Sequence, residues 1–166
     1  MMRAVVMSDS HGDETGLLDL LESLWRWVGP VDAYIHLGDG ARDFISLENR
    51  IWQRDPTAIR IVIKGNCDIG CDLPEQQTVW LGSHLALATH GHRYHVKDTL
   101  LIAEDAAREL GCDLLLYGHT HLQQTEQRTV LCVNPGSARE GCIALITEDR
   151  DGALQVRPWN IADGRE

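Results

Sequence analysis

Positive charge is scarce in this chain: Lys and Arg number 15 against 25 Asp and Glu, so the formal net charge is −10 at pH 7. No run of basic side chains occurs along the sequence. Proteins that bind nucleic acid neutralise its phosphates with clustered Lys and Arg. The composition therefore argues against a nucleic-acid duplex as partner.

Long apolar stretches are also missing. The apolar runs extend over only a few residues, whereas a helix that crosses a bilayer needs about 20. Residues 1–4 lead directly into a strand-like run, without the apolar region of a secretory signal. We therefore expect a cytoplasmic protein with no membrane association.

Repeats, linkers and low-complexity segments are absent too. The 166 residues are 43% apolar and 24% charged, which is ordinary for a folded protein. A chain of this length can bury a core without disulfides. We expect a single domain that spans residues 1–166.

The five cysteines form no recognisable framework. Their number is odd, and they are scattered at positions 67, 71, 112, 132 and 142. Cys67 and Cys71 lack the second pair that a zinc site of this kind needs. Because most of the five lie in apolar, strand-like segments, we expect buried free thiols in a reducing compartment.

The clearest helix is expected over residues 13–28, before Gly29-Pro30. At about 100° per residue its apolar arc is about 180° wide, with Trp25 and Trp27 near opposite margins. Contact with one sheet covers a narrower arc. Because Trp is enriched at interfaces, we predict a homodimer; the alternative is that the second ring packs beneath a neighbouring loop.

Strands and helices alternate in the first half of the chain, and the second half is mostly strands. We expect helices over 97–110 and 41–54, a hairpin of strands 78–81 and 84–88, and strands over 126–133, 141–147 and 153–158. This order predicts an α/β sandwich of two mixed sheets with helices outside.

Five polar clusters each follow an apolar, strand-like run. They are Asp9-Ser10-His11, Gly38-Asp39, Gly65-Asn66-Cys67-Asp68, His90-Gly91-His92 and Gly118-His119-Thr120-His121. In open α/β sheets, ligands bind outside the carboxyl ends of the strands. Together the clusters predict one composite metal site whose seven candidate ligands are Asp9, His11, Asp39, Asn66, His90, His119 and His121.

The types of ligand indicate the kind of metal. Imidazole with carboxylate or amide oxygen suits Mn, Fe, Co, Ni or Zn, and disfavours Mg and Ca. Seven side chains are too many for one ion that keeps an open position. They suit two divalent ions bridged by a carboxylate, with the ions about 3.5–4 Å apart.

The five motifs, in this order, resemble those of the calcineurin-like metallophosphoesterases, and especially the YfcE-like phosphodiesterase group. The resemblance extends over about residues 3–147. It implies a four-layer α/β/β/α sandwich and a hydroxide that bridges two ions, manganese first among them, and attacks a small phosphate ester in line.

The resemblance also implies individual roles. One ion would be held by Asp9, His11, Asp39 and His121, and the other by Asp39, Asn66, His90 and His119, so that Asp39 bridges. Asp39, Asn66 and His92 would take part in catalysis, with His92 stabilising charge on the phosphoryl oxygens.

Cys67 departs from the pattern of many family phosphatases, which carry there a His thought to protonate the leaving group. A thiol with a pKa near 8.5 is a poorer acid than an imidazole with a pKa near 6.5. Either His92 substitutes, or the substrate has a good leaving group. We therefore predict that diesters are preferred over monoesters.

Two other functions compete with this interpretation. One is a protein-binding scaffold on the same fold, like the retromer subunit that resembles these enzymes; such scaffolds typically lose a ligand, whereas all seven are present here. The other is a nuclease, which the net charge and the absence of an extra DNA-binding segment oppose.

The remaining polar residues have weaker signals. We expect His36 to be a core histidine, His84 and His95 to be solvated, and Asp68 to orient either Asn66 or His92. Residues 134–137 are expected to form a structural turn beneath the site.

Overall fold

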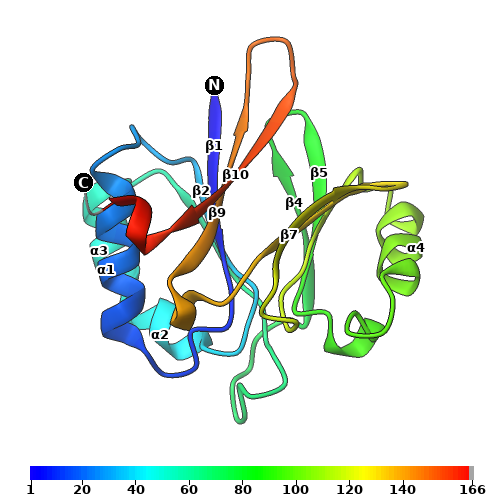
Figure 1. Ribbon diagram of the computed structural model, residues 1–166, viewed down its shortest axis with the longest axis horizontal. Helices are drawn as coiled ribbons and strands as arrows, with labels where there is room; N and C mark the ends of the chain where they lie inside the picture. Colours follow the sequence, from blue (N-terminus) through cyan, green and yellow to red (C-terminus); the bar gives the residue numbers. More distant parts are fainter. Residues whose placement is uncertain (165–166) are drawn as a thin grey trace.

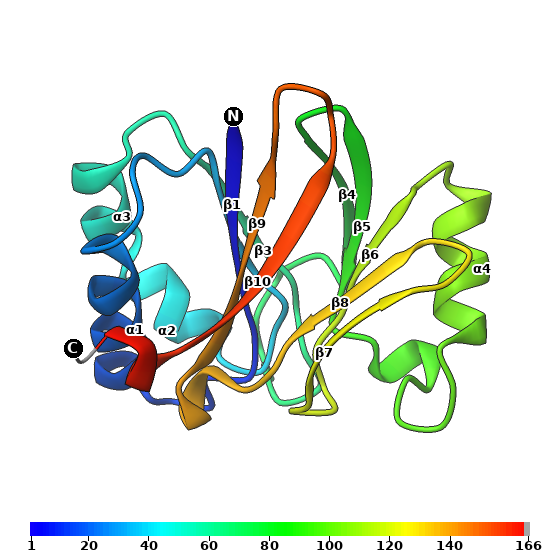
Figure 2. The same ribbon diagram turned by 45° about the horizontal axis from the view of Figure 1, so that its top comes forward.

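Two five-stranded β-sheets lie face to face, and helices cover their outer faces (Figures 1 and 2). The structure is a computed structural model that describes residues 1–164. The layers follow the order helix, sheet, sheet, helix. This confirms the predicted four-layer α/β/β/α sandwich of two mixed sheets.

The first sheet has the strand order β10-β9-β1-β2-β3. Its strands are β1 (Met2–Met7), β2 (Ala33–His36), β3 (Ile59–Val62), β9 (Cys142–Glu148) and β10 (Leu154–Asn160). β1, β2 and β3 are parallel, and β9 and β10 are antiparallel to their neighbours. The helices on its outer side are α1 (Glu14–Trp25), α2 (Ala41–Ser46) and α3 (Glu48–Arg54).

The second sheet has the order β4-β5-β6-β8-β7. Its strands are β4 (Gln76–Leu81), β5 (His84–Thr89), β6 (Leu114–Leu116), β7 (Gln123–Gln127) and β8 (Leu131–Pro135). β5, β6 and β8 are parallel, and β4 and β7 form antiparallel edges. One helix, α4 (Leu101–Glu109), lies on the outer side of this sheet (Figure 2).

The side chains of β1 show why this strand lies in the middle of the first sheet. Val5 and Met7 belong to the apolar core shared with the helices, whereas Ala4 and Val6 belong to the core between the sheets. All four are fully buried. Because successive strand residues point to opposite faces, a continuous apolar run fits a strand covered on both sides.

The helices are shorter than the sequence pattern predicts. The segment 41–54, expected as one helix, is divided at Leu47 into α2 and α3. The expected helix 13–28 ends at Trp25, and the expected helix 97–110 begins only at Leu101. Apolar periodicity overestimates these lengths because Val28 and Leu100 pack against the cores although both lie outside the helices. No helix within residues 1–164 is long and apolar enough to cross a membrane.

The strand predicted over 126–133 is wrong, because the chain turns there and forms the hairpin β7–β8. Glu104 of α4, which is buried, holds this turn. Its carboxylate accepts hydrogen bonds from Arg128 Nε (2.7 Å) and from the hydroxyl of Thr129 (2.9 Å). The anchor lies on another element, so the strand-like pattern of the segment alone does not reveal it.

The expectation of buried cysteines is partly wrong. All five are free thiols, but only Cys112 and Cys132 are buried. Burial raises the pKa of Cys132 to about 12, which keeps this thiol neutral and unreactive. Cys71 and Cys142 are half-buried and Cys67 is exposed.

His84 joins the two sheets, so the expected solvated position is wrong. Its Nδ1 lies 2.5 Å from Asp113 Oδ2, and its Nε2 lies 2.8 Å from the carbonyl oxygen of Gly152 in the β9–β10 hairpin. Both partners are acceptors, so both ring nitrogens must carry hydrogen. The hydrogen bond to Gly152 raises the pKa of His84, and Asp113 adds to the rise against the opposing effect of burial.

We expect this contact to make stability depend on pH. Because the folded pKa of His84 lies above its unfolded value of about 6.5, its contribution is complete below that pH and is lost as pH rises through the folded pKa. The variant His84→Gln should have a lower Tm than the wild type at about pH 6. Between about pH 6 and about pH 8.5, the Tm of the variant should fall less than that of the wild type. Thermal unfolding followed by circular dichroism measures both; an identical pH dependence in the two proteins would refute the expectation.

Candidate metal centre

The carboxyl ends of the parallel strands lie level with one another in each sheet. Met7 is opposite His36, and His36 is opposite Val62, at the ends of β1, β2 and β3. In the second sheet, Ala88 of β5 is opposite Leu116 of β6. The loops that follow these strands carry the five polar clusters, and the structure brings the clusters together at one place.

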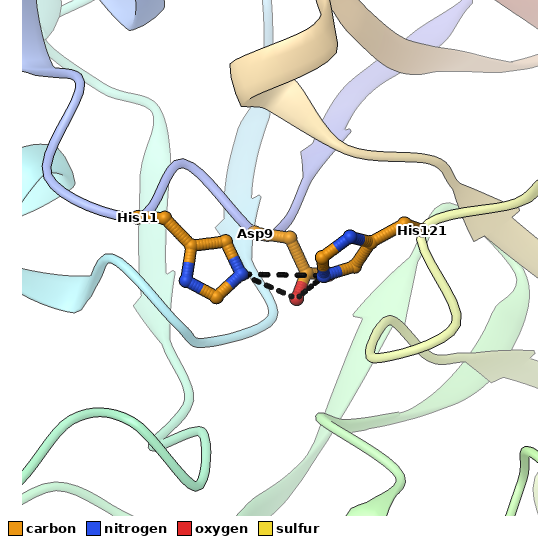
Figure 3. Close-up of side chains that lie close together, drawn as sticks. All are labelled: Asp9, His11 and His121. Carbon is orange, nitrogen blue, oxygen red and sulfur yellow. Dashed lines mark hydrogen bonds and ion pairs between the residues drawn. The ribbon is translucent and has the colours of Figure 1, made fainter.

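The first group of donors is formed by Asp9, His11 and His121 (Figure 3). Asp9 Oδ1 lies 3.1 Å from His121 Nε2 and 3.6 Å from His11 Nε2. The two imidazole nitrogens lie 3.2 Å apart. Asp9 is fully buried, yet its Oδ1 accepts no hydrogen bond from any described residue.

The second group is formed by Asp39, His90 and His119. His90 Nε2 lies 3.3 Å from Asp39 Oδ2 and 3.2 Å from His119 Nδ1. The amide Oδ1 of Asn66 approaches the same nitrogen at 3.1 Å. Six of the seven predicted ligands therefore form these two groups, and the seventh, Asn66, lies beside the second.

The spacing and chemistry of both groups fit a metal ion. Bonds of about 2.0–2.2 Å from an ion to nitrogen or oxygen place neighbouring donors roughly 3–3.5 Å apart. The distances above fall in or close to that range. A buried carboxylate oxygen without a donor is costly, and a cation is the partner that Asp9 Oδ1 lacks.

Hydrogen bonds behind the donors fix their orientation. His90 Nδ1 lies 2.8 Å from the carbonyl oxygen of Leu37, so it carries the hydrogen and Nε2 faces the site. Burial lowers the pKa of His90, but Asp39 outweighs it and the net shift is upward. A proton therefore competes with a metal ion for this nitrogen.

Asp39 and His119 are held in the forms that bind cations. Burial would raise the pKa of Asp39, but hydrogen bonds from His90 and from the backbone N–H of Cys67 lower it well below its usual range. Burial, and then the charge of His90, lowers the pKa of His119 to about 4. Near neutral pH the first is a carboxylate and the second a neutral imidazole.

Five of the seven predicted ligands have a left-handed backbone. Their φ angles are 57° at Asp9, 48° at His11, 55° at Asp39, 68° at His119 and 62° at His121. Residues other than glycine rarely adopt this conformation, which costs about 1–3 kcal/mol at each position. Such strain is concentrated at functional sites, and the motif spacing did not predict it.

Hydrogen bonds between the loops compensate for this strain. The N–H groups of Asp9 and His11 donate to the carbonyls of Gly38 and Asp39, both at 2.9 Å. The hydroxyl of Ser137 donates to the carbonyl of Asp9 at 2.9 Å. The loops after β1 and β2 therefore stabilise one another.

Two glycines allow the Asp39 and Asn66 loops to meet. A Cβ on Gly65 would lie 2.2 Å from Asp39 Oδ1, and a Cβ on Gly38 would lie 2.4 Å from the backbone nitrogen of Gly65. Gly38 also has a φ of 98°. Any larger residue at either position would push the bridging carboxylate candidate out of place.

Asp68 stabilises the same two loops through their backbone. Among the described residues, its carboxylate accepts N–H groups of Asp39, Gly40, Ala41 and Gly65 at 2.8–3.0 Å. These bonds outweigh burial and lower the pKa of Asp68. The prediction that it orients the side chain of Asn66 or His92 is therefore wrong: it positions backbone instead.

Sequence reasoning also missed Ser8, Ser10 and Asp43. Ser8 Oγ donates to Asp9 Oδ2 at 2.6 Å, which turns Oδ1 toward His121. Ser10 Oγ donates to Asp43 Oδ2 at 2.6 Å. No spacing rule marks these residues, because they act through hydrogen bonds between loops rather than through a motif.

The remaining expectations about polar residues are confirmed. His36 is fully buried, with a pKa lowered to about 4 by burial, and His95 is exposed. Asn134 Nδ2 donates to the carbonyl of Gly118 at 3.0 Å, and Ser137 supports Asp9 as described above. The turn over 134–137 therefore underlies the site.

A cleft of about 350 Å³ opens beside the donors. His11 and Asp39 form part of its wall, and the rest comes from the start of α2 and the loop over 67–71. The exposed thiol of Cys67 borders it. Burial and the nearby Asp39 raise the pKa of Cys67, so this thiol retains its proton and is a poor acid.

Comparison with known proteins agrees with this geometry. The model of the calcineurin-like phosphoesterase superfamily domain matches residues 2–148. The probable metallophosphoesterase YsnB of Bacillus subtilis (strain 168) is 39% identical over 159 residues, which cover 92% of this chain and 88% of YsnB. The chain belongs to the calcineurin-like phosphoesterase superfamily, as the resemblance of its motifs predicted, and its class is that of a metal-binding phosphoesterase.

Solved structures show the same fold. A conserved uncharacterized protein from Streptococcus pneumoniae TIGR4, described as a predicted phosphoesterase, has a TM-score of 0.75 at 30% identity, over 97% of this chain and 90% of that chain. A novel archaeal phosphodiesterase has 0.68 at 22%, covering 95% and 100%. Vps29 from Chaetomium thermophilum has 0.68 at 18%, covering 96% of both chains. At these last two identities the likeness concerns the fold alone.

Proposed function

We propose that the protein is a dinuclear metal-dependent phosphodiesterase that hydrolyses a small phosphate ester by in-line displacement. The observation that carries this proposal is the position of Asp39. Its Oδ2 lies 3.3 Å from His90 Nε2 in one group and 3.9 Å from His11 Nε2 in the other. A carboxylate that reaches both groups suits a bridged pair of ions.

Each donor group would hold one divalent ion, with Asp39 shared. Manganese is the proposed metal, and Fe, Ni, Co and Zn are compatible with the same donors. When bound, the ions would supply Lewis acidity toward phosphoryl oxygens and lower the pKa of a water that can attack phosphorus.

His92 and Asn66 are the proposed contacts to the phosphoryl group. The ring of His92 lies 5.4 Å from that of His90, and its buried Nδ1 has no hydrogen-bond partner among the described residues. Burial, and then the charge of His90, lowers the pKa of His92. The neutral ring can still donate one N–H to a phosphoryl oxygen, as can the amide of Asn66.

Cys67 supports the preference for diesters. Cys67 occupies the position from which an acid would protonate the leaving group, and the raised pKa of its thiol makes proton donation to a departing alkoxide slow. A substrate whose leaving group departs without being protonated is therefore favoured. The likeness in fold to an archaeal phosphodiesterase is consistent with this choice.

A protein-binding scaffold on the same fold is the second candidate function, as the likeness of these enzymes to a retromer subunit implies. The seven donors and the strained backbone that positions them favour the enzyme. A screen of the protein, loaded in turn with Mn, Fe, Ni, Co and Zn, against phosphomonoesters, aryl diesters and cyclic nucleotides tests this choice, with EDTA-treated protein as control. Hydrolysis of diesters by the loaded protein alone supports the enzyme; no turnover of any class with any of the five metals would favour the scaffold.

The proposed partners are a small phosphate ester in the cytoplasm and a second copy of the chain. The structure sharpens the dimer proposal: Trp25 is half-buried and donates a hydrogen bond to Tyr34, whereas Trp27 is 58% exposed. Large exposed aromatic rings are typical of interfaces. No membrane or nucleic-acid duplex is proposed as a partner.

Trp27→Glu should therefore convert a dimer into a monomer and leave phosphodiesterase turnover in place, because Trp27 follows α1 and is not among the site residues. Light scattering at micromolar concentration measures the mass, with Trp52→Glu, another exposed ring on α3, as matched control. A wild-type mass near 18.6 kDa would end the dimer proposal.

A further inference from the structure

Arg42 is the only Lys or Arg among the described residues that line the 350 Å³ cleft beside the metal centre. It lies in the first turn of α2, directly after Ala41, and is exposed. Its guanidinium makes no hydrogen bond or ion pair with any residue in the 1–164 range that the structure describes. Arg42 therefore presents an unpaired positive charge to the cleft.

The three carboxylates that line the cleft with Arg42 have other partners. Asp43 accepts hydrogen bonds from Ser10 and the N–H of Gly12. Asp68 accepts four backbone N–H groups, as described above. Asp39 faces His90 and the N–H of Cys67. The guanidinium is therefore free to bind an anion that enters the cleft.

The charge of the loaded site favours such an anion. Four carboxylates lie in or beside the cleft and donor groups: Asp9, Asp39, Asp43 and Asp68. The two divalent ions of the proposed function would balance their four negative charges. Arg42 then leaves the loaded site with a net charge of +1, which favours a negatively charged substrate over a neutral or cationic one.

The size and the wall of the cleft limit what carries this anion. A volume of about 350 Å³ is near the lower end for small-molecule sites, which span about 300–1,000 Å³. Ile69, which is 83% exposed, and Cys71 provide an apolar margin on the same loop. Arg42 Nη2 is directed toward this loop, 4.0 Å from the point where a Cβ on Gly70 would lie.

We propose that the substrate is a small diester whose retained arm carries a second oxyanion, and that Arg42 binds this group and determines specificity. The planar guanidinium can donate two parallel N–H bonds to a carboxylate or to a phosphate-like group. The scissile phosphorus lies at the metal ligands and the second anion at Arg42, joined by a short linker. This inference rests on the proposed function, because it concerns the same site.

Matched aryl diesters test the proposal. Four substrates share a p-nitrophenolate leaving group and differ in the second arm, which is ethyl, 2-carboxyethyl, 2-phosphonoethyl or choline. We expect kcat/KM of the Mn-loaded protein to be at least about tenfold higher for an anionic arm than for ethyl, since hydrogen bonds between charged groups are strong, and to be lowest for choline. Comparison of the carboxyl and phosphonyl arms shows which oxyanion is preferred.

Arg42→Ala should bring the ratio of kcat/KM for anionic and ethyl arms close to one. Arg42→Lys should retain part of the preference for anionic arms, because the ammonium keeps the positive charge but lacks the two parallel N–H donors of the guanidinium. Arg150→Ala removes the same charge from the exposed β9–β10 hairpin and should leave the ratio unchanged. A ratio near one in the wild type, or the same ratio in wild type and Arg42→Ala, would overturn the proposal.

A binding measurement separates this inference from the proposed function. Ethyl phosphate and 2-carboxyethyl phosphate are the products of two of these diesters, and calorimetry measures their affinity for the Mn-loaded protein without turnover. Tighter binding of the second product by the wild type but not by Arg42→Ala supports the inference even if no diester is cleaved, in which case the enzymatic proposal alone fails. Equal affinity of the two products in the wild type would overturn the inference while hydrolysis of the ethyl diester still supports the enzyme.

Discussion

Asp39→Asn is expected to lower kcat/KM for an aryl diester by about 10³-fold or more. Changes one shell removed from a metal typically cost 10–100-fold, and this change weakens the one carboxylate that reaches both donor groups. The amide oxygen of Asn can still accept the N–H of Cys67, which Asp39 Oδ1 now accepts at 2.7 Å, so the loop should keep its fold. The loss should therefore arise at the metals.

Asp9→Asn provides the matched control, because Asp9 belongs to one donor group only. It should reduce the metal content by about one ion per chain, whereas Asp39→Asn should reduce the affinity for both. Metal analysis after titration with Mn, and kcat/KM at saturating Mn, measure the two effects. If the two variants lost the same single ion, Asp39 would not be shared.

A steep dependence of rate on the leaving group is the second large effect. With the Cys67 thiol in place of an acid, aryl diesters with leaving groups of low pKa should react far faster than alkyl diesters. General acid catalysis is worth about 10²–10⁴-fold, and that is the scale of the expected deficit for alkoxides. A plot of log kcat/KM against leaving-group pKa measures the slope, and a shallow slope would contradict the role assigned to Cys67.

Cys67→His is expected to flatten this slope by raising turnover of alkyl diesters by about tenfold or more. The side chain at this position is exposed and borders the cleft, so an imidazole has room. Cys67→Ser is the control, since a hydroxyl is no better an acid than the thiol and should keep the steep slope. Equal slopes for His and Ser would show that position 67 does not contact the leaving group.

The order of the motifs was enough to predict the fold and the convergence of the donors. Each cluster follows an apolar strand, and parallel strands end at the same edge of a sheet. Asp9, Asp39 and His119 each follow such a strand closely, and this position alone predicted that their side chains lie near one another. The continuous apolar character of β1 likewise predicts a strand buried on both faces.

What the sequence did not predict depends on contacts between distant loops. The left-handed φ of Asp9 and His121 depends on the tertiary structure, because this conformation is uncommon for any residue other than glycine, even though Asp and His adopt it more often than most. Asp68 stands next to Cys67 in the motif, yet it acts on the backbone of Asp39, 29 residues away. His84 is polar and begins strand β5, and only the position of the β9–β10 hairpin gives its second ring nitrogen an acceptor.

The number of metal ions per chain tests the central claim most directly. Protein purified without chelator and reloaded with Mn should saturate near two ions per chain, because the seven donors lie in or beside two groups that share Asp39. Elemental analysis together with titration calorimetry gives this number. Saturation at one ion per chain would contradict the dinuclear centre.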